Sequence, residues 1–262
     1  MPKINMKNII KNTKLKISTW LQKIIKRKYL TTIVLAIPLL IAVAAKNISG
    51  NGDNTRIFYI SICGTFIGAL SAFVLTISRE ESTRKKKEIS SMHHTLFIIG
   101  RKLAIIHSLK KECEIHKKKI LIIRSLELPA KRLPDISDLK FPYETLSFLL
   151  EERCAIVLNQ LSLAQYAFYQ TIEAYRYRNE FYIETIQPIM KGDNFYKKML
   201  NEEKIREILG EINSEMIVEN TNEVYDLIDD SIQVLNKTQT DLINAGKEIY
   251  PNVKFPKYSM KE

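Results

Sequence analysis

Two long apolar runs near the N-terminus constrain this 262-residue chain more than any other feature. Residues 29–45 read YLTTIVLAIPLLIAVAA and residues 57–78 read IFYISICGTFIGALSAFVLTIS, and neither run contains Asp, Glu, Lys or Arg. At about 1.5 Å per helical residue, both runs reach across a hydrocarbon core about 30 Å thick, the first only just. The sequence therefore predicts a transmembrane hairpin, with residues 46–56 as a short external loop.

Two other interpretations of these runs stay open. The runs also fit two buried core helices of a soluble protein, and Ala42-Val43-Ala44 resembles the cleavage site of a signal peptide. The basic segment before the first run is long for a signal peptide, and the apolar residues continue past Pro38 almost to the end of the run. This favours an uncleaved first helix over a signal peptide.

The charges that flank the runs predict a topology. Residues 1–28 carry nine Lys or Arg and no acidic residue, and the second run is followed by Arg79 and by the basic residues at positions 84–87. Cytoplasmic flanks of membrane helices are enriched in Lys and Arg. We therefore expect a multi-pass membrane protein with both termini in the cytoplasm.

The basic flanks also provide candidate contacts with the membrane surface. Residues 1–28 alternate apolar and basic residues, as in a basic amphipathic cytoplasmic helix that lies on anionic lipid. A disordered basic tail is the alternative, and direct nucleic-acid binding is not expected because no base-reading motif accompanies the charge. The candidate membrane-surface anchors are Trp20, Lys23, Lys26, Arg27, Lys28, Arg84, Lys85, Lys86 and Lys87.

Small residues in the second run predict a helix-packing face. Gly64, Gly68 and Ala72 recur every four residues, and such spacing lets two helix backbones approach closely. This face could pack within one chain or between copies, and the second possibility predicts a homo-oligomer. In the first run, Pro38 removes one backbone donor and predicts a kink.

Residues 79–262 predict a cytoplasmic helical bundle with long helices. Apolar residues at three- and four-residue spacing run through residues 79–126, a proline-rich loop spans 128–142, and an aromatic-rich helical pattern spans 143–187. A last, acidic helical region spans about 194–249 and breaks near Gly210. The predicted fold class is therefore an all-α membrane protein, a two-helix transmembrane hairpin followed by this bundle.

The search for catalytic and metal-binding motifs finds almost nothing. No phosphate-binding loop, paired Cys-x-x-Cys or zinc-protease motif occurs, and we predict no cofactor, no metal and no enzymatic activity. Cys113 and His116 share a helix face but would need another ligand to hold a metal. Arg101 and His107, in RKLAIIH, resemble the R-x-x-x-x-x-H motif of HEPN ribonucleases, which makes them the only catalytic candidates.

The layout as a whole resembles the small two-transmembrane effectors of bacterial anti-phage defence, including abortive-infection proteins and those paired with retron reverse transcriptases. The resemblance implies a toxin-like antiviral effector that perturbs the inner membrane when activated and so arrests or kills the infected cell. It implies as partners the lipid bilayer and a regulatory protein or ribonucleoprotein on the cytoplasmic side. Two alternatives stay open: a membrane-anchored sensor or scaffold that recruits a cytoplasmic partner, and a membrane-tethered HEPN-like ribonuclease.

Overall fold

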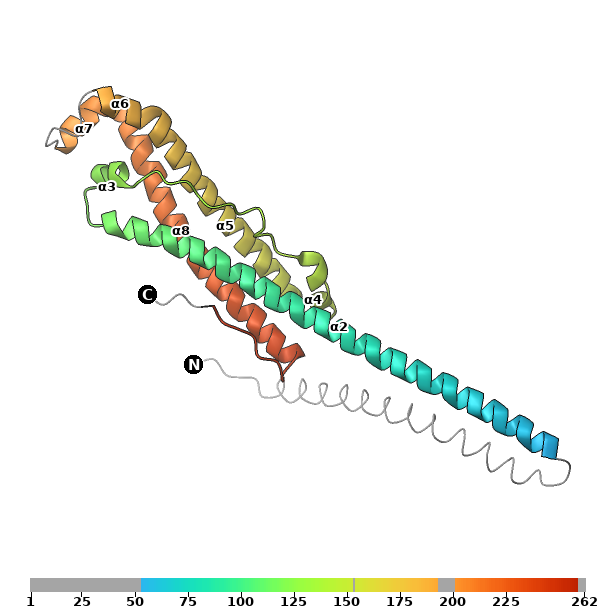
Figure 1. Cartoon of the computed structure of the whole chain (residues 1–262). Helices are drawn as coiled ribbons and strands as arrows, with labels where there is room; N and C mark the ends of the chain where they lie inside the picture. Colours follow the sequence, from blue (N-terminus) through green and yellow to red (C-terminus); the bar gives the residue numbers. More distant parts are fainter. Residues whose placement is uncertain (1–52, 153, 193–200, 259–262) are drawn as a thin grey trace, which may run out of the picture. The chain divides into compact units, whose positions relative to one another are not determined.

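The computed structural model describes residues 53–152, 154–192 and 201–258, and within these ranges every regular element is helical (Figure 1). The all-α class therefore agrees with the prediction. In chain order the elements are α2 (Asp53–His116), α3 (Leu121–Glu127), η1 (Tyr143–Leu146), α4 (Phe148–Glu151), α5 (Ala155–Phe181), η2 (Tyr182–Ile186), α6 (Gln187–Gly192), α7 (Glu202–Leu209) and α8 (Glu211–Ile249).

The chain divides into two compact units, Met1–Arg84 and Lys85–Glu262, and helix α2 contributes residues to both. In the second unit, α5 and α8 lie antiparallel and side by side (Figure 1). Two hydroxyls join these helices, because Thr171 Oγ1 donates to Leu227 O at 3.0 Å and Thr238 Oγ1 donates to Gln160 O at 3.3 Å.

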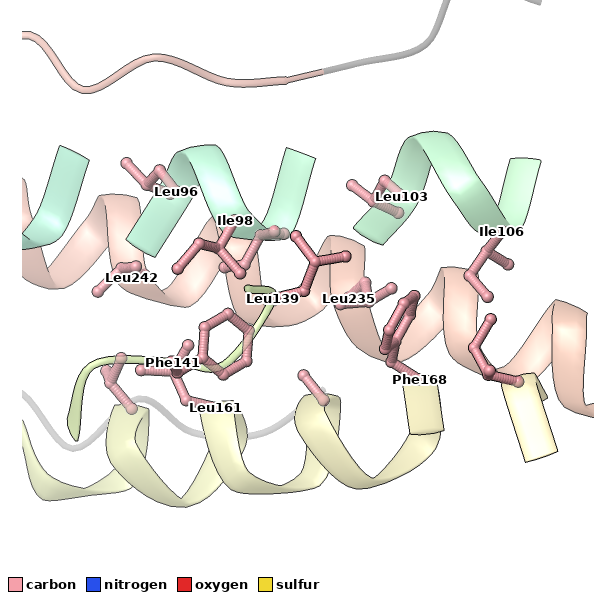
Figure 2. Packing of buried hydrophobic residues seen from close by; sticks show 14 of the residues in the cluster. Leu96, Ile98, Leu103, Ile106, Leu139, Phe141, Leu161, Phe168, Leu235 and Leu242 are labelled. Carbon is pink, nitrogen blue, oxygen red and sulfur yellow. The ribbon is translucent and has the colours of Figure 1, made fainter. Parts of the chain in front are cut away.

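The core of the second unit is formed by α2, α5 and α8 (Figure 2). The predicted stripe on α2, Ile89 to Ile106, is confirmed from Met92 onward, where its members are at most 2% exposed, whereas Ile89 is only half-buried. Their three- and four-residue spacing turns one helix face inward, where each side chain leaves water. These residues are Met92, Leu96, Ile99, Leu103 and Ile106.

Residues 128–142, which we call the strap, cover this core without forming a helix. Leu128, Leu139 and Phe141 of the strap are buried in the core cluster. Side chains of α5 bond to its backbone, as Tyr175 Oη donates to Pro129 O at 3.2 Å and Asn179 Nδ2 donates to Lys131 O at 3.1 Å. The loop predicted from its prolines is therefore confirmed and is an integral part of the bundle.

The predicted break at Gly210 is also confirmed. Gly210 has φ of 77°, a backbone conformation that favours glycine, and it separates α7 from α8. At the start of α7, Asn201 accepts a hydrogen bond from the Lys204 backbone N–H at 3.0 Å. Around this turn a second apolar cluster joins α3, η2, α6, α7 and the beginning of α8: Ile122, Leu126, Ile186, Met190, Ile205, Leu209 and Ile217.

The membrane part of the predicted fold class is wrong for the part of the chain that the structure describes. No helix there combines the length and the apolarity needed to cross a membrane, and this includes α2, which contains the second apolar run. The predicted span at residues 57–78 and the multi-pass inner-membrane localisation are corrected accordingly. The prediction rested on the absence of charge, but the run also contains less apolar residues: Ser61, Gly64, Thr65, Gly68, Ser71, Thr76 and Ser78.

Several predicted features fall outside the described residues. These are the amphipathic segment 1–28, the first predicted span 29–45 with the kink at Pro38, and most of the external loop 46–56. The anchors expected in the first segment lie there too: Trp20, Lys23, Lys26, Arg27 and Lys28.

Candidate interaction surface

Exposed apolar side chains are concentrated in the first part of α2, residues 57–77, which we call the apolar segment. Phe58 is 61% exposed, Phe73 60% and Leu75 70%. Single exposed apolar residues are ordinary, whereas a contiguous group of them is typical of an interaction site. The full group of large exposed apolar residues comprises Ile57, Phe58, Ile62, Phe66, Ile67, Phe73, Leu75 and Ile77.

Helical geometry sorts the apolar segment into a large side and a small side. At about 100° per residue, five large residues share an arc of about 100°, and five small residues share a similar arc roughly opposite. The large side consists of Phe58, Ile62, Phe66, Phe73 and Ile77, and the small side of Ser61, Gly64, Gly68, Ser71 and Ala72. Ile57 and Leu75, near the two ends of the segment, also fall within the arc of the small side.

The predicted packing residues Gly64, Gly68 and Ala72 are all exposed on the small side. Apart from the neighbouring residues and backbone of α2 itself, no atom of the described part of the chain lies within 4 Å of the place that a Cβ would occupy at Gly64 or at Gly68. The fold, as far as it is described, therefore does not use the small size of these glycines. A partner helix that approaches closely would use it.

The two threonine hydroxyls of the apolar segment are satisfied within the helix. Thr65 Oγ1 donates to Ser61 O at 2.9 Å, and Thr76 Oγ1 donates to Ala72 O at 2.8 Å. Since these donors already have acceptors, covering them with an apolar partner leaves no unpaired hydroxyl hydrogen.

A group of exposed basic residues follows the apolar segment along α2. Arg84, Lys85, Lys86 and Lys87 are all exposed. Their predicted contact with a membrane surface stays a prediction, since exposure on a helix is compatible with any acidic partner.

The two predicted catalytic candidates are not brought together. Arg101 forms an ion pair with Asp138 of the strap, while His107 is half-buried on the same helix. Six residues at about 100° each place the two side chains about 120° apart around α2. Among the described residues no hydrogen bond joins them, and the ribonuclease hypothesis stays a prediction.

The cysteines and histidines do not assemble a metal site within the described ranges, where no three ligand-type side chains converge. His93 stacks on Phe255 with ring centroids 5.2 Å apart, and His116 Nδ1 lies 3.3 Å from a Glu127 carboxylate oxygen. Burial raises the pKa of the Cys113 thiol to about 11, so it stays protonated and unreactive at neutral pH.

Lys102 is a buried amine that the sequence analysis did not single out. It is 0% exposed, and its Nζ donates to Gln165 Oε1 at 2.6 Å. The Nζ also lies over the rings of Phe141, Phe168 and Tyr169, at 4.0, 4.9 and 5.6 Å from their centroids. Burial lowers the pKa of Lys102 to about 7.

Arg178 of α5 is a second buried cation that was missed. Its guanidinium donates to Ser125 O and to Asn179 Oδ1, and it lies 4.9 Å from the Tyr182 ring centroid. Burial lowers its pKa to about 10. Helical spacing contained a signal for both cations: Lys102 is three residues after the buried Ile99, and Arg178 is three residues after the buried Tyr175.

Comparison of the chain with protein-family models, with curated proteins and with solved structures finds no match. A function must therefore be argued from the residues and geometry of this chain.

Proposed function

We propose that this chain is a non-enzymatic scaffold that associates with other copies of itself through the apolar segment of α2. The observation that carries the proposal is the concentration of large exposed apolar side chains at residues 57–77. Covering such a surface releases water, and each fully buried Leu, Ile or Phe side chain contributes about 1.5–3 kcal/mol relative to exposure.

The chemistry of the segment favours a second copy as the partner. The segment carries no charge, so two identical segments meet without like-charge repulsion, even though the chain has a net charge of +11. Between Ser61 and Ala72, the small side of one helix also provides room for large residues of another, such as Phe66 and Phe73. Contact between the large side of one copy and the small side of the next is heterologous, and such contacts build rings or larger assemblies.

The bundle formed by residues 85–262 would then be the part that each copy presents to other molecules. The regulatory protein or ribonucleoprotein expected from the sequence is a possible ligand of this part and stays a prediction. Disruption of the inner membrane is not carried forward, because it required a span at residues 57–78, and no described helix is long and apolar enough to cross a membrane.

The test is the mass of the full-length protein in solution, measured by light scattering over a hundredfold range of concentration. We expect an assembly larger than a monomer, and at least tenfold weaker association in the double variant Gly64→Leu, Gly68→Leu. Leucine is a better helix former than glycine, so weaker association cannot be attributed to loss of helix.

The matched control is Thr83→Leu, Ser90→Leu, which adds two leucines at exposed positions of α2 outside the apolar segment. This variant should associate like the wild-type chain. A wild-type protein that stays monomeric throughout, or a double variant that associates normally, would refute the proposal.

A further inference from the structure

The environment of Lys102 combines full burial with the absence of a carboxylate partner among the described residues. The amine lies between α2, which carries it, α5, which contributes Gln165, and the strap, which contributes Phe141 (Figure 2 shows Phe141 and Phe168 in this core). An aromatic face and one amide oxygen stabilise an ammonium group, but much less than water does.

The charged and titratable groups near Lys102 belong to three elements. From α5 the titratable neighbour is the Tyr169 phenol, whose ring faces the amine. The strap carries Asp138 and Lys140, but Asp138 pairs with Arg101 of α2 and its side chain is 59% exposed. The pKa of Lys102 is lowered because burial removes water from its ammonium group.

The strap is the part of this environment that is not helical, and it can detach without unfolding a helix. Its contact with Lys102 is the Phe141 ring, whose centroid lies 4.0 Å from Nζ. The rest of the strap is held by the buried Leu128 and Leu139, by the hydrogen bonds from Tyr175 and Asn179, and by the ion pairs of Lys131 with Glu112 and of Asp138 with Arg101. If the strap detaches from the bundle, water reaches the amine of Lys102 and its pKa returns to the ordinary lysine value of 10.5. Phe141 and its buried neighbours Leu128 and Leu139 become exposed at the same time.

We propose that Lys102 is a proton-operated latch, in which protonation of its amine promotes release of the strap from the bundle. The open form binds the proton more tightly than the closed form, since only the closed form buries the amine. Acid therefore shifts the equilibrium toward the open form, and alkali shifts it toward the closed form. This inference concerns residues 102 and 128–142 and does not depend on association through the apolar segment.

The experiment is hydrogen exchange of the full chain at pH 6.0 and pH 8.5, corrected for the intrinsic effect of pH. The reporter is the strap, where the Leu139 amide donates to Ile136 O at 3.1 Å. A lysine with a pKa of about 7 when closed and 10.5 when open gives roughly 30-fold more opening at pH 6.0 than at pH 8.5. The Lys102→Met variant should show less than a threefold change.

Two further variants make the result specific. Asp138→Asn removes the ion pair to Arg101, so it should raise opening at both pH values and leave the roughly 30-fold ratio intact. Lys102→Leu repeats the test if the methionine variant does not fold. All variants keep the four histidines, so a pH effect from histidine would persist in them. The proposal would be overturned if hydrogen exchange of the wild-type strap did not change with pH, or if it changed equally in the Lys102 variants.

Discussion

The two parts of helix α2 are rich in the same residue types and yet meet opposite surroundings. In residues 57–77, eight large apolar side chains are 38–70% exposed, whereas the stripe from Met92 to Ile106 is at most 2% exposed. The difference lies in how the apolar residues are arranged. The stripe occupies one face and is covered by α5, α8 and the strap, while the apolar segment carries apolar or small residues on two sides, which favours cover by other molecules.

The largest expected effect is on the free energy of unfolding, when one phenylalanine of the core and one of the apolar segment are each replaced by alanine. Phe168→Ala removes a fully buried ring and should lower the free energy of unfolding by about 3–5 kcal/mol. Phe73→Ala removes a ring that is 60% exposed and should change monomer stability by less than about 0.5 kcal/mol, while it weakens association. Urea unfolding at low protein concentration measures both, and equal losses would contradict the assignment of the two surfaces.

An intermediate effect is expected from Lys102, which should make the stability of the protein depend on pH. The unfolded chain holds a proton on Lys102 up to about pH 10.5, whereas the folded chain loses it near pH 7. Stability should therefore rise by about 2 kcal/mol between pH 7 and pH 9, and this contribution is lost again as the pH falls toward 7. Lys102→Met should remove this rise.

The control for this prediction is Lys86→Met, which removes an exposed lysine from the same helix. Denaturant unfolding across this pH range should give the wild-type slope for Lys86→Met and a flatter one for Lys102→Met. A Lys102→Met variant with the full wild-type slope would show that another group carries the pH dependence.

The last comparison is between the stability changes caused by alanine at two glycines, Gly246 of the core and Gly64 of the apolar segment. A Cβ at Gly246 would lie 2.7 Å from Phe255 and 2.8 Å from Met92, so Gly246→Ala should cost about 1–3 kcal/mol of stability. Gly64 has no atom that near, so Gly64→Ala should be neutral or stabilise the helix by up to about 1 kcal/mol. Thermal unfolding distinguishes the two, and a destabilised Gly64→Ala monomer would indicate that the apolar segment is covered within its own chain.

Parts of the bundle were predictable because local rules agree with the tertiary structure there. The spacing of Leu96, Ile99 and Leu103 predicts their burial, the prolines predict the strap, and Gly210 predicts the break before α8. The continuous helix predicted for residues 79–126 was wrong in detail, because it is interrupted after His116, where three lysines follow one another. The helical pattern predicted for residues 143–187 is present, as the short elements η1 and α4 followed by α5 and η2.

The aromatic residues of the helical pattern at 143–187 divide between the core and the surface. Phe168 and Tyr175 are buried, but Tyr166 and Tyr177 are 63% and 53% exposed. Spacing alone places all four on a helix, and which face is covered depends on where α8 and the strap pack. An ion pair joins α2 to the acidic α8, where Lys110 Nζ lies 2.8 Å from an Asp229 carboxylate oxygen.

The sequence by itself determined the helical class of the described chain, the inward face of α2 beyond residue 84, the strap and the break at Gly210. These follow from local rules, namely helical periodicity and the backbone preferences of proline and glycine. Only the tertiary structure decided that Lys102 and Arg178 are buried. Helical spacing puts both residues in line with apolar neighbours, but burial of a charge depends on residues distant in the chain, such as Phe141 over Lys102 and Ser125 beside Arg178.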